Sequence, residues 1–270
     1  MKTRIITAAV LTPLLLLFLI ALPTICTVLL FGVICAVAAY ELLVGTGFVK
    51  QIRLVIYAGI ISFSTALWSC LGMNFYWALG AVLLFGIALF TELLVSKCKL
   101  SLKSLALTFL AGTLLPLLLC SMVRLFCQPN GRIFVFIPFV IAFLSDTGAY
   151  FVGSFLGKHK LAPEISPNKS VEGAVGGIVS AMVSMVVFCL IIQFGFSLKV
   201  NYGFALIYGL LGSVAGIFGD LCFSAIKRQS GIKDFSNLMP GHGGVLDRFD
   251  SVIFVAPFVE LLMILIPLAV

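Results

Sequence analysis

A polar, charged stretch near the end of the chain holds the residues best suited to chemistry. It begins at Asp220, Ser224 and Lys227, whose i, i+4 and i+7 spacing places them on one face of a helix. Asp220 lies within an apolar run, where a carboxylate requires a cation or a wet cavity. Two interpretations follow: a structural Asp220–Lys227 interaction, or a metal-ligating carboxylate beside a phosphate-binding cation.

The same stretch continues into a glycine-rich segment, residues 240–244, followed by Asp247 and Asp250. Glycines let backbone N–H groups approach an anion closely and form a phosphate-binding nest. The two aspartates are three residues apart, so at a helix start they project to one side. Carboxylates beside phosphates indicate Mg²⁺, which takes one or two carboxylates plus phosphate oxygens. The structural alternatives are a tight turn for the glycines and helix N-capping for the aspartates.

Four basic side chains in this stretch are candidates for phosphate binding. They are Lys227, Arg228, Lys233 and Arg248. His242 could act as a general base. A phosphate nucleophile, however, is already largely ionised at neutral pH, because its second pKa is about 6. We therefore expect His242 to donate a hydrogen bond or shape the loop.

A second polar region, about residues 146–173, contributes Asp146 within an apolar run and the weaker phosphate candidate Lys169. Its glycines, Gly153, Gly157 and Gly173, indicate close helix packing through small residues. Ser224 and Lys227 also match the S-x-x-K pattern of serine acyl enzymes, but the companion motifs are absent. Elsewhere, Glu41 and Glu92 fall near the ends of apolar runs, where they could simply reach water.

The elements that position these residues are predicted to be membrane-spanning helices. The chain is 62% hydrophobic and 10% charged, with a mean hydropathy of +1.24, whereas soluble domains are about 25% charged. A span needs about 20 mainly apolar residues. We predict an all-α polytopic membrane protein with about nine spans: 5–22, 24–43, 54–72, 75–95, 104–123, 132–152, 171–195, 202–224 and 251–269.

Loop charges predict the orientation of these spans. With the N-terminus inside, nearly all of the 17 Lys and Arg fall in cytoplasmic segments, leaving only Arg124, Arg132 and Lys199 outside. The positive-inside rule therefore favours an N-in, C-out arrangement. It places both long polar loops, about 153–170 and 225–250, on the cytoplasmic side. We expect one integral membrane domain over 1–270, with N-terminal spans over about 1–123 and a site-bearing half over about 132–270.

Composition also excludes several classes of partner and site. The net charge of +7 is explained by topology, with attraction to anionic lipid head groups as an added interpretation. No basic stripe is interleaved with exposed aromatics, so nucleic acid is not an expected partner. The eight cysteines form no C-x-x-C pair and lie mostly in apolar runs, which predicts free thiols rather than zinc ligands or a disulfide framework.

The pattern S-x-x-K-R-x-x-x-x-K-D-x-x-x-x-x-P-G-H-G-G-x-x-D-R-x-D fills residues 224–250 completely. It closely resembles the signature of the phosphatidate cytidylyltransferases, also called CDP-diacylglycerol synthases. The segment from Asp146 to Gly173 is also similar to that family, with Ser170 where a threonine is expected. The N-terminal half resembles it only in hydropathy and in Glu41 after the second span.

This resemblance implies that CTP and phosphatidate are converted to CDP-diacylglycerol and pyrophosphate with Mg²⁺, beside which a monovalent cation such as K⁺ is an option. It implies an enzyme of the bacterial inner membrane, in contact with membrane lipid, commonly a homodimer, with its active site on the cytoplasmic side. It assigns metal to Asp220 and Asp247. The full predicted site comprises catalytic Asp220, Lys227, Asp247 and Asp250, and substrate-binding Ser224, Arg228, Lys233, His242, Gly243, Gly244, Arg248, Lys169 and Asp146.

Two other functions stay open on the sequence. One is a CTP-dependent lipid kinase of the polyprenol type. The other is a transporter of an anionic metabolite, which would also place charges within spans. Transporter charges, however, are expected near the midplane between related halves. Here they gather on one side, and the chain shows no internal repeat.

Overall fold

The structure is a computed structural model that describes residues 2–72, 74–97 and 99–269, without the side chains of residues 2–6 and 8. The chain forms two compact units. Unit 1 contains the described residues up to Cys127 together with Gln229–Arg248. Unit 2 contains Gln128–Arg228 and the described residues from Phe249 onward. The expectation of one integral membrane domain stays a prediction.

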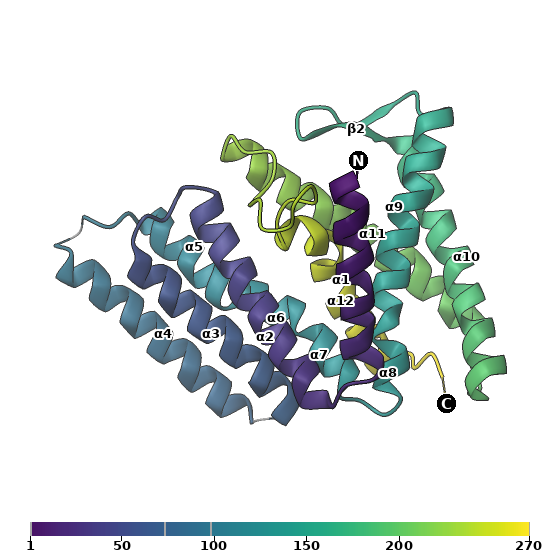
Figure 1. The fold of residues 1–270 in the computed structure, drawn as a ribbon, viewed down its shortest axis with the longest axis horizontal. Helices are drawn as coiled ribbons and strands as arrows, with labels where there is room; N and C mark the ends of the chain where they lie inside the picture. Colours follow the sequence, from purple (N-terminus) through teal and green to yellow (C-terminus); the bar gives the residue numbers. More distant parts are fainter. Residues whose placement is uncertain (1, 73, 98, 270) are drawn as a thin grey trace. The chain divides into compact units, whose positions relative to one another are not determined.

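Unit 1 is built from helices that lie side by side, with α2, α3 and α4 adjacent in Figure 1. Apolar side chains that are almost fully buried form its core, among them Phe31, Leu54, Leu119 and Met122. The elements are α1 (Lys2–Ile20), α2 (Thr24–Tyr40), the π-helical turn η1 (Glu41–Gly45), α3 (Ile52–Leu71), α4 (Phe75–Val95), α5 (Leu102–Gly112), α6 (Leu114–Leu119) and α7 (Ser121–Phe126).

The ends of the unit 1 helices follow local sequence. Asn74 and Ser101 accept hydrogen bonds from backbone N–H groups in the first turns of α4 and α5, as N-cap residues do. Gly72 ends α3 with φ 59°, a left-handed conformation that glycine adopts without steric cost. The segment predicted as one span over 104–123 lies in a run of three helices, α5, α6 and α7, which are divided at Thr113 and Cys120.

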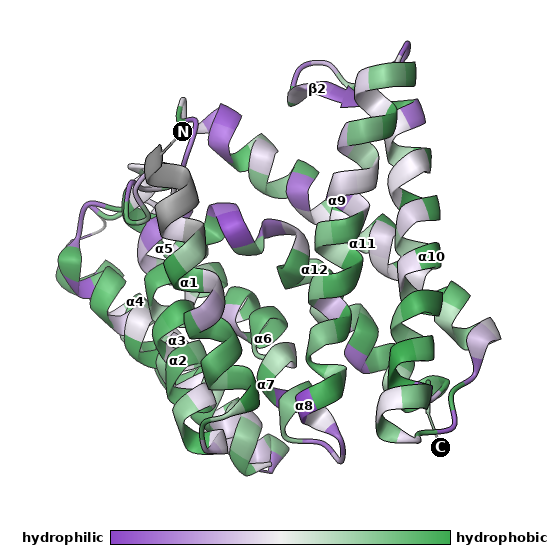
Figure 2. Ribbon diagram, turned by 45° about the vertical axis from the view of Figure 1, so that its right-hand side comes forward, coloured by the Kyte–Doolittle hydropathy of each residue, from purple (hydrophilic) through white to green (hydrophobic). Residues whose placement is uncertain are grey.

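Unit 2 contains the short helix α8 (Gly131–Phe134), then α9 (Phe136–Leu156), strands β1 (Lys160–Ala162) and β2 (Ser166–Ser170), α10 (Val171–Phe196) and α11 (Tyr202–Gln229). Helix α12 (Leu246–Leu265) begins in unit 1 and runs on in unit 2 from Phe249. The strands pair antiparallel, with Lys160 opposite Ser170. Figure 2 shows hydrophobic residues along α9 and α10 and hydrophilic residues at the β2 hairpin.

Helices α9 and α10 pack closely through small residues, as the glycine pattern predicted. A Cβ added to Gly173 would lie 2.8 Å from the Ala149 carbonyl oxygen, and one added to Gly177 would lie 2.8 Å from that of Ser145. Real Cβ atoms do not approach other atoms so closely. The glycines on α10 therefore set the separation of the two helices.

The expected helical architecture is confirmed at the level of its elements. Each of the nine predicted spans falls on a helix or on a broken run of helices. Within the described residues, seven helical segments are long and apolar enough to cross a membrane. Helix α1 contributes only the shorter apolar stretch Ala9–Ile20, and α12 carries four ionisable side chains. The β1–β2 hairpin is an element that the all-α prediction did not include.

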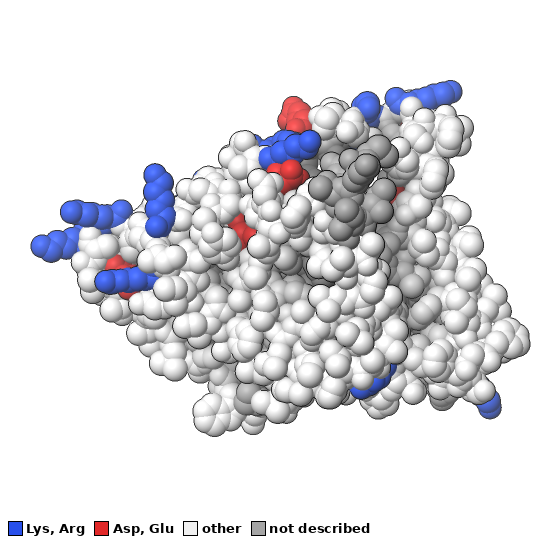
Figure 3. Space-filling model, viewed as in Figure 1, with Lys and Arg blue, Asp and Glu red and all other residues white. Residues whose placement is uncertain are grey.

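Charges in unit 1 gather at one end of the α3–α5 helices. Residues Lys50 and Arg53 lie at the start of α3, Lys97 and Lys99 lie between α4 and α5, and Lys103 lies at the start of α5. Figure 3 shows basic side chains at this end and an uncharged surface along these helices. This distribution agrees with the positive-inside pattern used to predict orientation.

Candidate active site

Unit 2 brings six of the predicted site residues into direct contact or close electrostatic interaction. The Lys169 Nζ atom lies 2.5 Å from Asp220 Oδ2, and about a quarter of each side chain is exposed. The Ser224 hydroxyl donates a hydrogen bond of 3.1 Å to Asp220 Oδ1, which confirms that the i, i+4 pair shares a helix face. Asp220 therefore has a cation partner, as a carboxylate in an apolar helix requires. That partner comes from β2.

The β1–β2 hairpin positions Lys169. Its base is fixed by Glu172, whose carboxylate accepts hydrogen bonds from the backbone N–H groups of Lys158 and His159 and lies 2.6 Å from His159 Nδ1. Its turn is fixed by Arg228, whose Nε donates to the Ile165 carbonyl at 3.2 Å. Arg228 was predicted to bind phosphate, and here its Nε links α11 to the hairpin.

A close approach of α11 and α12 places Asp250 beside this ion pair. A Cβ added to Gly219 would lie 2.7 Å from the Asp250 carbonyl oxygen, so only glycine permits this helix separation. Burial, together with the charge of Asp220, raises the pKa of Asp250 to about 7, and the charge of Lys227 acts in the opposite direction. Asp250 precedes the predicted span 251–269. Its raised pKa therefore reflects burial first and the neighbouring carboxylate second.

Asp146 completes this group, which we call the acidic cluster and define as Asp146, Asp220 and Asp250. Asp146 projects from α9 and interacts electrostatically with Asp220 and Lys169. Three helices, α9, α11 and α12, therefore each contribute one carboxylate, and the hairpin contributes the cation. Hard oxygen donors with excess negative charge favour a divalent cation or a cationic partner.

Unit 1 contains the glycine-rich segment, residues 240–244, which forms a tight turn. The N–H groups of Met239 and His242 donate to the carbonyls of Gly243 and Met239, at 2.9 and 2.8 Å. Gly241 and Gly243 have φ angles of 77° and 81°, in the region that favours glycine. The turn predicted as the structural alternative for these glycines is therefore present. A turn and an anion-binding nest are compatible uses of the same backbone.

Asp247, in the first turn of α12, closes this turn. Its Oδ2 atom accepts hydrogen bonds from the backbone N–H groups of Phe235, at 2.8 Å, and Gly244, at 2.9 Å. A Cβ on Gly243 would lie 2.9 Å from the same oxygen. Both donors precede Asp247 in the chain, so these bonds stabilise the turn and are not the helix N-cap predicted as an alternative; the metal role of Asp247 stays a prediction.

Glu41 is a site residue that sequence reasoning undervalued. It is 1% exposed, so the expectation that it simply reaches water is wrong. Its carboxylate accepts hydrogen bonds from the Ser236 hydroxyl at 2.6 Å and from the N–H groups of Val245 and Leu246 at 2.9 and 2.8 Å. A π-helical turn often marks a functional site. The position of Glu41 directly after the second apolar run was the available signal.

Three other predicted site residues lie in or near this segment: Arg248, His242 and Lys233. Arg248 is exposed, and its Nε donates to the His242 carbonyl at 2.9 Å. The backbone of His242 thus shapes the loop, as predicted. Its Nδ1 atom is buried with no hydrogen-bond partner among the described residues. Lys233 is exposed to solvent. An unpaired buried nitrogen beside positive-φ glycines fits a segment that receives a polar ligand.

The fit of Mg²⁺ can be tested against these residues. Within the described parts of the chain, no three His, Cys, Asp or Glu side chains form a ready metal site. Mg²⁺, however, is commonly held by one or two carboxylates plus waters and substrate phosphates. The chemistry of the acidic cluster fits that mode, with Asp220 as the ligand that would exchange Lys169 for the ion. The assignment of Asp220 and Asp247 to metal stays a prediction.

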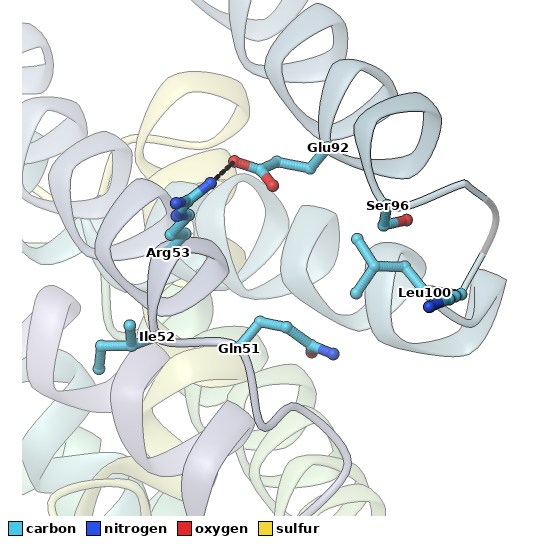
Figure 4. Close-up of a pocket in the computed structure, with 7 residues that line it drawn as sticks. Gln51, Ile52, Arg53, Glu92, Ser96 and Leu100 are labelled. Carbon is cyan, nitrogen blue, oxygen red and sulfur yellow. Dashed lines mark ion pairs between the residues drawn. The ribbon is translucent and has the colours of Figure 1, made fainter.

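A pocket in unit 1 contains none of the predicted site residues (Figure 4). The Arg53 Nη1 atom lies 3.8 Å from Glu92 Oε1. The Tyr57 hydroxyl donates to the same oxygen at 3.0 Å. Glu92 therefore has protein partners rather than water alone. The residues that line the pocket are Gln51, Ile52, Arg53, Glu92, Ser96, Lys99 and Leu100.

The fold and the carboxylates described above are those of a helical membrane protein with a polar, charged site. A sequence model of the cytidylyltransferase family matches residues 2–266, so the chain belongs to this family. A phosphatidate cytidylyltransferase of Bacillus subtilis (strain 168) is 50% identical over 135 residues, which are 50% of this chain and 49% of that protein.

Two staphylococcal proteins give similar matches. The phosphatidate cytidylyltransferase of Staphylococcus haemolyticus (strain JCSC1435) is 40% identical over 137 residues, and that of Staphylococcus aureus (strain COL) is 41% identical over 137 residues. Each match covers 51% of this chain and 51% of the relative. The chain thus spans about half the length of the curated relatives it matches.

Proposed function

We propose that this protein transfers CMP from CTP to phosphatidate, giving CDP-diacylglycerol and pyrophosphate in phospholipid biosynthesis. The single observation that carries the proposal is the Lys169–Asp220 pair beside Asp250, which places one cation with two carboxylates carried by apolar helices. The family match and the names of the curated relatives support the same reaction.

The proposed reaction is a nucleotidyl transfer. A phosphate oxygen of phosphatidate attacks the α-phosphorus of CTP. The bond from this phosphorus to the bridging oxygen breaks, and pyrophosphate leaves with the bonding electrons. Catalysis of such transfers depends mainly on positioning and charge neutralisation. Mg²⁺, when bound, would supply neutralisation of phosphate charge and orientation of the phosphates.

The chain's own residues would supply the remaining contributions. Asp220 would hold the cation, and Lys169, released from Asp220, would pair with a phosphate oxygen. Lys227 already acts electrostatically on Asp250, so it is near enough to the cluster to neutralise phosphate there. Arg228 would keep the hairpin in place through Ile165. Ser224 would orient Asp220 through their hydrogen bond.

The glycine-rich segment would bind phosphate or nucleotide through backbone N–H groups. Its shape is maintained by Glu41 and Asp247, which together accept four backbone N–H groups. Arg248 and Lys233 are exposed cations of the same segment. A pyrophosphate or nucleotide ligand therefore matches its charge and its backbone geometry.

We also propose the finer features of topology. The chain would cross the bacterial inner membrane nine times, N-in and C-out, with the active site at the cytoplasmic face. The basic end of α3–α5 supports this orientation. Acyl chains of the substrate would stay in the bilayer. A homodimer and a monovalent cation beside Mg²⁺ stay predictions of the resemblance.

One assay tests the proposed reaction against the two alternatives. Purified protein is incubated with CTP labelled in the cytidine, Mg²⁺ and phosphatidate. Label in the lipid together with pyrophosphate release is expected. CDP release with phosphate transfer to a lipid alcohol would instead identify a kinase. Neither product, combined with uptake of an anionic metabolite into vesicles, would identify a transporter.

A further inference from the structure

Two cysteines of unit 1 meet at the ends of α3 and α7. The Sγ atoms of Cys70 and Cys127 lie 3.2 Å apart. Cys70 is in the last turn of α3 and is half-buried, and Cys127 directly follows α7 and is exposed. The two thiols are therefore adjacent, and one of them is accessible to a reagent in solution.

Neighbouring side chains support this pairing. The Arg124 guanidinium donates a hydrogen bond to the Ser69 hydroxyl at 3.3 Å, next to Cys70 in the chain. It also donates to the Ser121 hydroxyl at 2.7 Å, which holds it against α7. Arg124 thus joins the same two helix ends that carry the thiols. Their proximity is a property of the packing of α3 against α7.

The pair lies at the end of α3 opposite its basic start. Helix α3 has 20 residues, which corresponds to about 30 Å at a rise of about 1.5 Å per residue. Arg53 and the lysines of the neighbouring loops lie at the other end. If that end is cytoplasmic, the thiols lie at the opposite membrane face, where disulfides form and persist.

We propose that Cys70 and Cys127 are a dithiol site that is oxidised to a disulfide at the extracytoplasmic face. The oxidant is a disulfide, either of a protein or of a small molecule. One thiolate attacks the oxidant to give a mixed disulfide, and the second thiolate then displaces the remaining half. The protein loses two protons and two electrons, and the oxidant is reduced to two thiols.

A second cysteine pair provides an internal comparison. The Sγ atoms of Cys35 and Cys120 lie 3.6 Å apart, but both residues are fully buried. A disulfide oxidant cannot reach them without opening the helices. We therefore expect Cys35 and Cys120 to stay reduced although their sulfur atoms are close. Comparing the two pairs shows whether oxidation depends on the distance between the thiols or on their exposure to the oxidant.

The disulfide would close a long loop that contains helices α4, α5, α6 and α7. Because such closure restricts the unfolded chain, we expect oxidation to raise the temperature at which unit 1 unfolds. Although Cys127 is exposed as a residue, partial burial of its thiol and the neighbouring Cys70 thiol raise its pKa to about 12. Little Cys127 thiolate exists at neutral pH, so oxidation should be slow there and faster at alkaline pH.

The test uses the full-length protein in intact cells. Cells are treated with the membrane-impermeant disulfide dithiobis(nitrobenzoate), free thiols are alkylated, and peptides are mapped by mass spectrometry without reduction. We expect a Cys70–Cys127 linked peptide, lost in Cys70→Ser and in Cys127→Ser and retained in Cys35→Ser. Cys120 should be recovered unlinked in every variant, and so should Cys35 wherever it is present.

The outcomes separate this proposal from the proposed orientation and function. Linkage only after the membrane is permeabilised would overturn the extracytoplasmic placement. No linkage in either intact or permeabilised cells, with both thiols alkylated, would overturn the dithiol site itself. Synthase activity is measured on the same samples. Absence of activity with a correctly formed disulfide would contradict the proposed reaction and leave the dithiol site supported.

Discussion

Three carboxylates of this protein have their negative charge balanced in two different ways. Asp220 pairs with a cation, Lys169, whereas Glu41 and Asp247 pair with backbone N–H groups. A cation can be exchanged for another cation during a reaction cycle. Backbone donors are part of the chain and hold a loop in one shape. The Lys169 partner therefore indicates that Asp220 can exchange one cation for another. The backbone partners of Glu41 indicate that it positions the glycine-rich segment.

Replacing Asp247 with asparagine tests the importance of its charge. The amide oxygen can still accept a backbone hydrogen bond, so the protein is expected to fold. Loss of the charge should lower turnover about a hundredfold or more, the scale seen when one preorganised electrostatic contact is removed. CMP transfer to phosphatidate is the measurement.

The matched control for Asp247→Asn is Glu92→Gln, which neutralises a partnered carboxylate in the unit 1 pocket. We expect this variant to keep nearly normal transfer. Near-normal turnover of Asp247→Asn, under conditions where Glu92→Gln is also active, would refute a role for the Asp247 charge in catalysis.

Replacing Glu41 with glutamine tests its positioning role. Glutamine presents one acceptor oxygen and one donor nitrogen, so at least one of the N–H groups of Val245 and Leu246 loses its partner. An unpaired buried donor costs about 1–3 kcal/mol. We expect earlier thermal inactivation and a raised KM for CTP. The Glu41→Asp variant, which keeps the charge, should recover part of the loss.

A KM for CTP that is unchanged in Glu41→Gln, alongside lower thermal stability, would limit Glu41 to a purely structural role. Thermal inactivation and initial-rate kinetics on the same preparations distinguish the two results.

At the scale of elements, glycines determine how closely the helices approach. Gly219 on α11 allows α12 to bring Asp250 next to Asp220, and Gly173 and Gly177 on α10 set its distance from α9. The hairpin then adds Lys169 from outside the helices. These two helix contacts and the hairpin thus bring the acidic cluster and Lys169 together, and a shift of any helix would separate the charges.

The variant Gly219→Ala tests this geometry. The added Cβ would meet the Asp250 carbonyl oxygen at 2.7 Å and Phe254 at 2.8 Å, so α11 and α12 must move apart. Overpacking of this kind costs about 1–3 kcal/mol. Both thermal stability and CMP transfer are expected to fall.

The comparison for Gly219→Ala is Gly80→Ala on α4, where an added Cβ meets nothing within 4 Å. Alanine is favoured over glycine in helices by about 1 kcal/mol, so this variant should be neutral or slightly more stable. Equal effects of the two substitutions would show that the α11–α12 separation is not the decisive factor.

At the scale of the whole molecule, the distribution of charge links the fold to the membrane. Seven helical segments among the described residues are long and apolar enough to cross it. Lys and Arg concentrate in the loops that the positive-inside rule assigns to the cytoplasm. The orientation of the chain in the membrane thus decides which side chains a nucleotide in the cytoplasm can reach and which an oxidant outside the cell can reach.

Two positions test the orientation: Lys158, which follows α9, and Lys199, which follows α10. In Lys199→Cys, a membrane-impermeant maleimide should label intact cells above the level of the unsubstituted protein. In Lys158→Cys, labelling above that level should appear only after permeabilisation. The reverse labelling pattern would show that the protein is inserted the other way round. The β1–β2 hairpin, which carries Lys169, would then lie outside the cell.

The sequence by itself determined the helices and their approximate ends. Every backbone group within a bilayer must be satisfied inside its own segment, so span-forming helices are set by local composition. Predicted ranges such as 75–95 and 171–195 therefore agree closely with α4 and α10. The contiguous pattern over residues 224–250 was also sufficient to indicate the family, because its residues are neighbours in the chain.

Only the tertiary structure decided which residues are partners. Lys169 from the hairpin forms an ion pair with Asp220, Glu41 holds a loop about 200 positions away, and Cys127 meets Cys70. Such contacts depend on helix separations and on a short hairpin whose β-structure the apolar pattern did not reveal. Local periodicity determines what a segment becomes, whereas the packing of distant segments determines what each side chain touches.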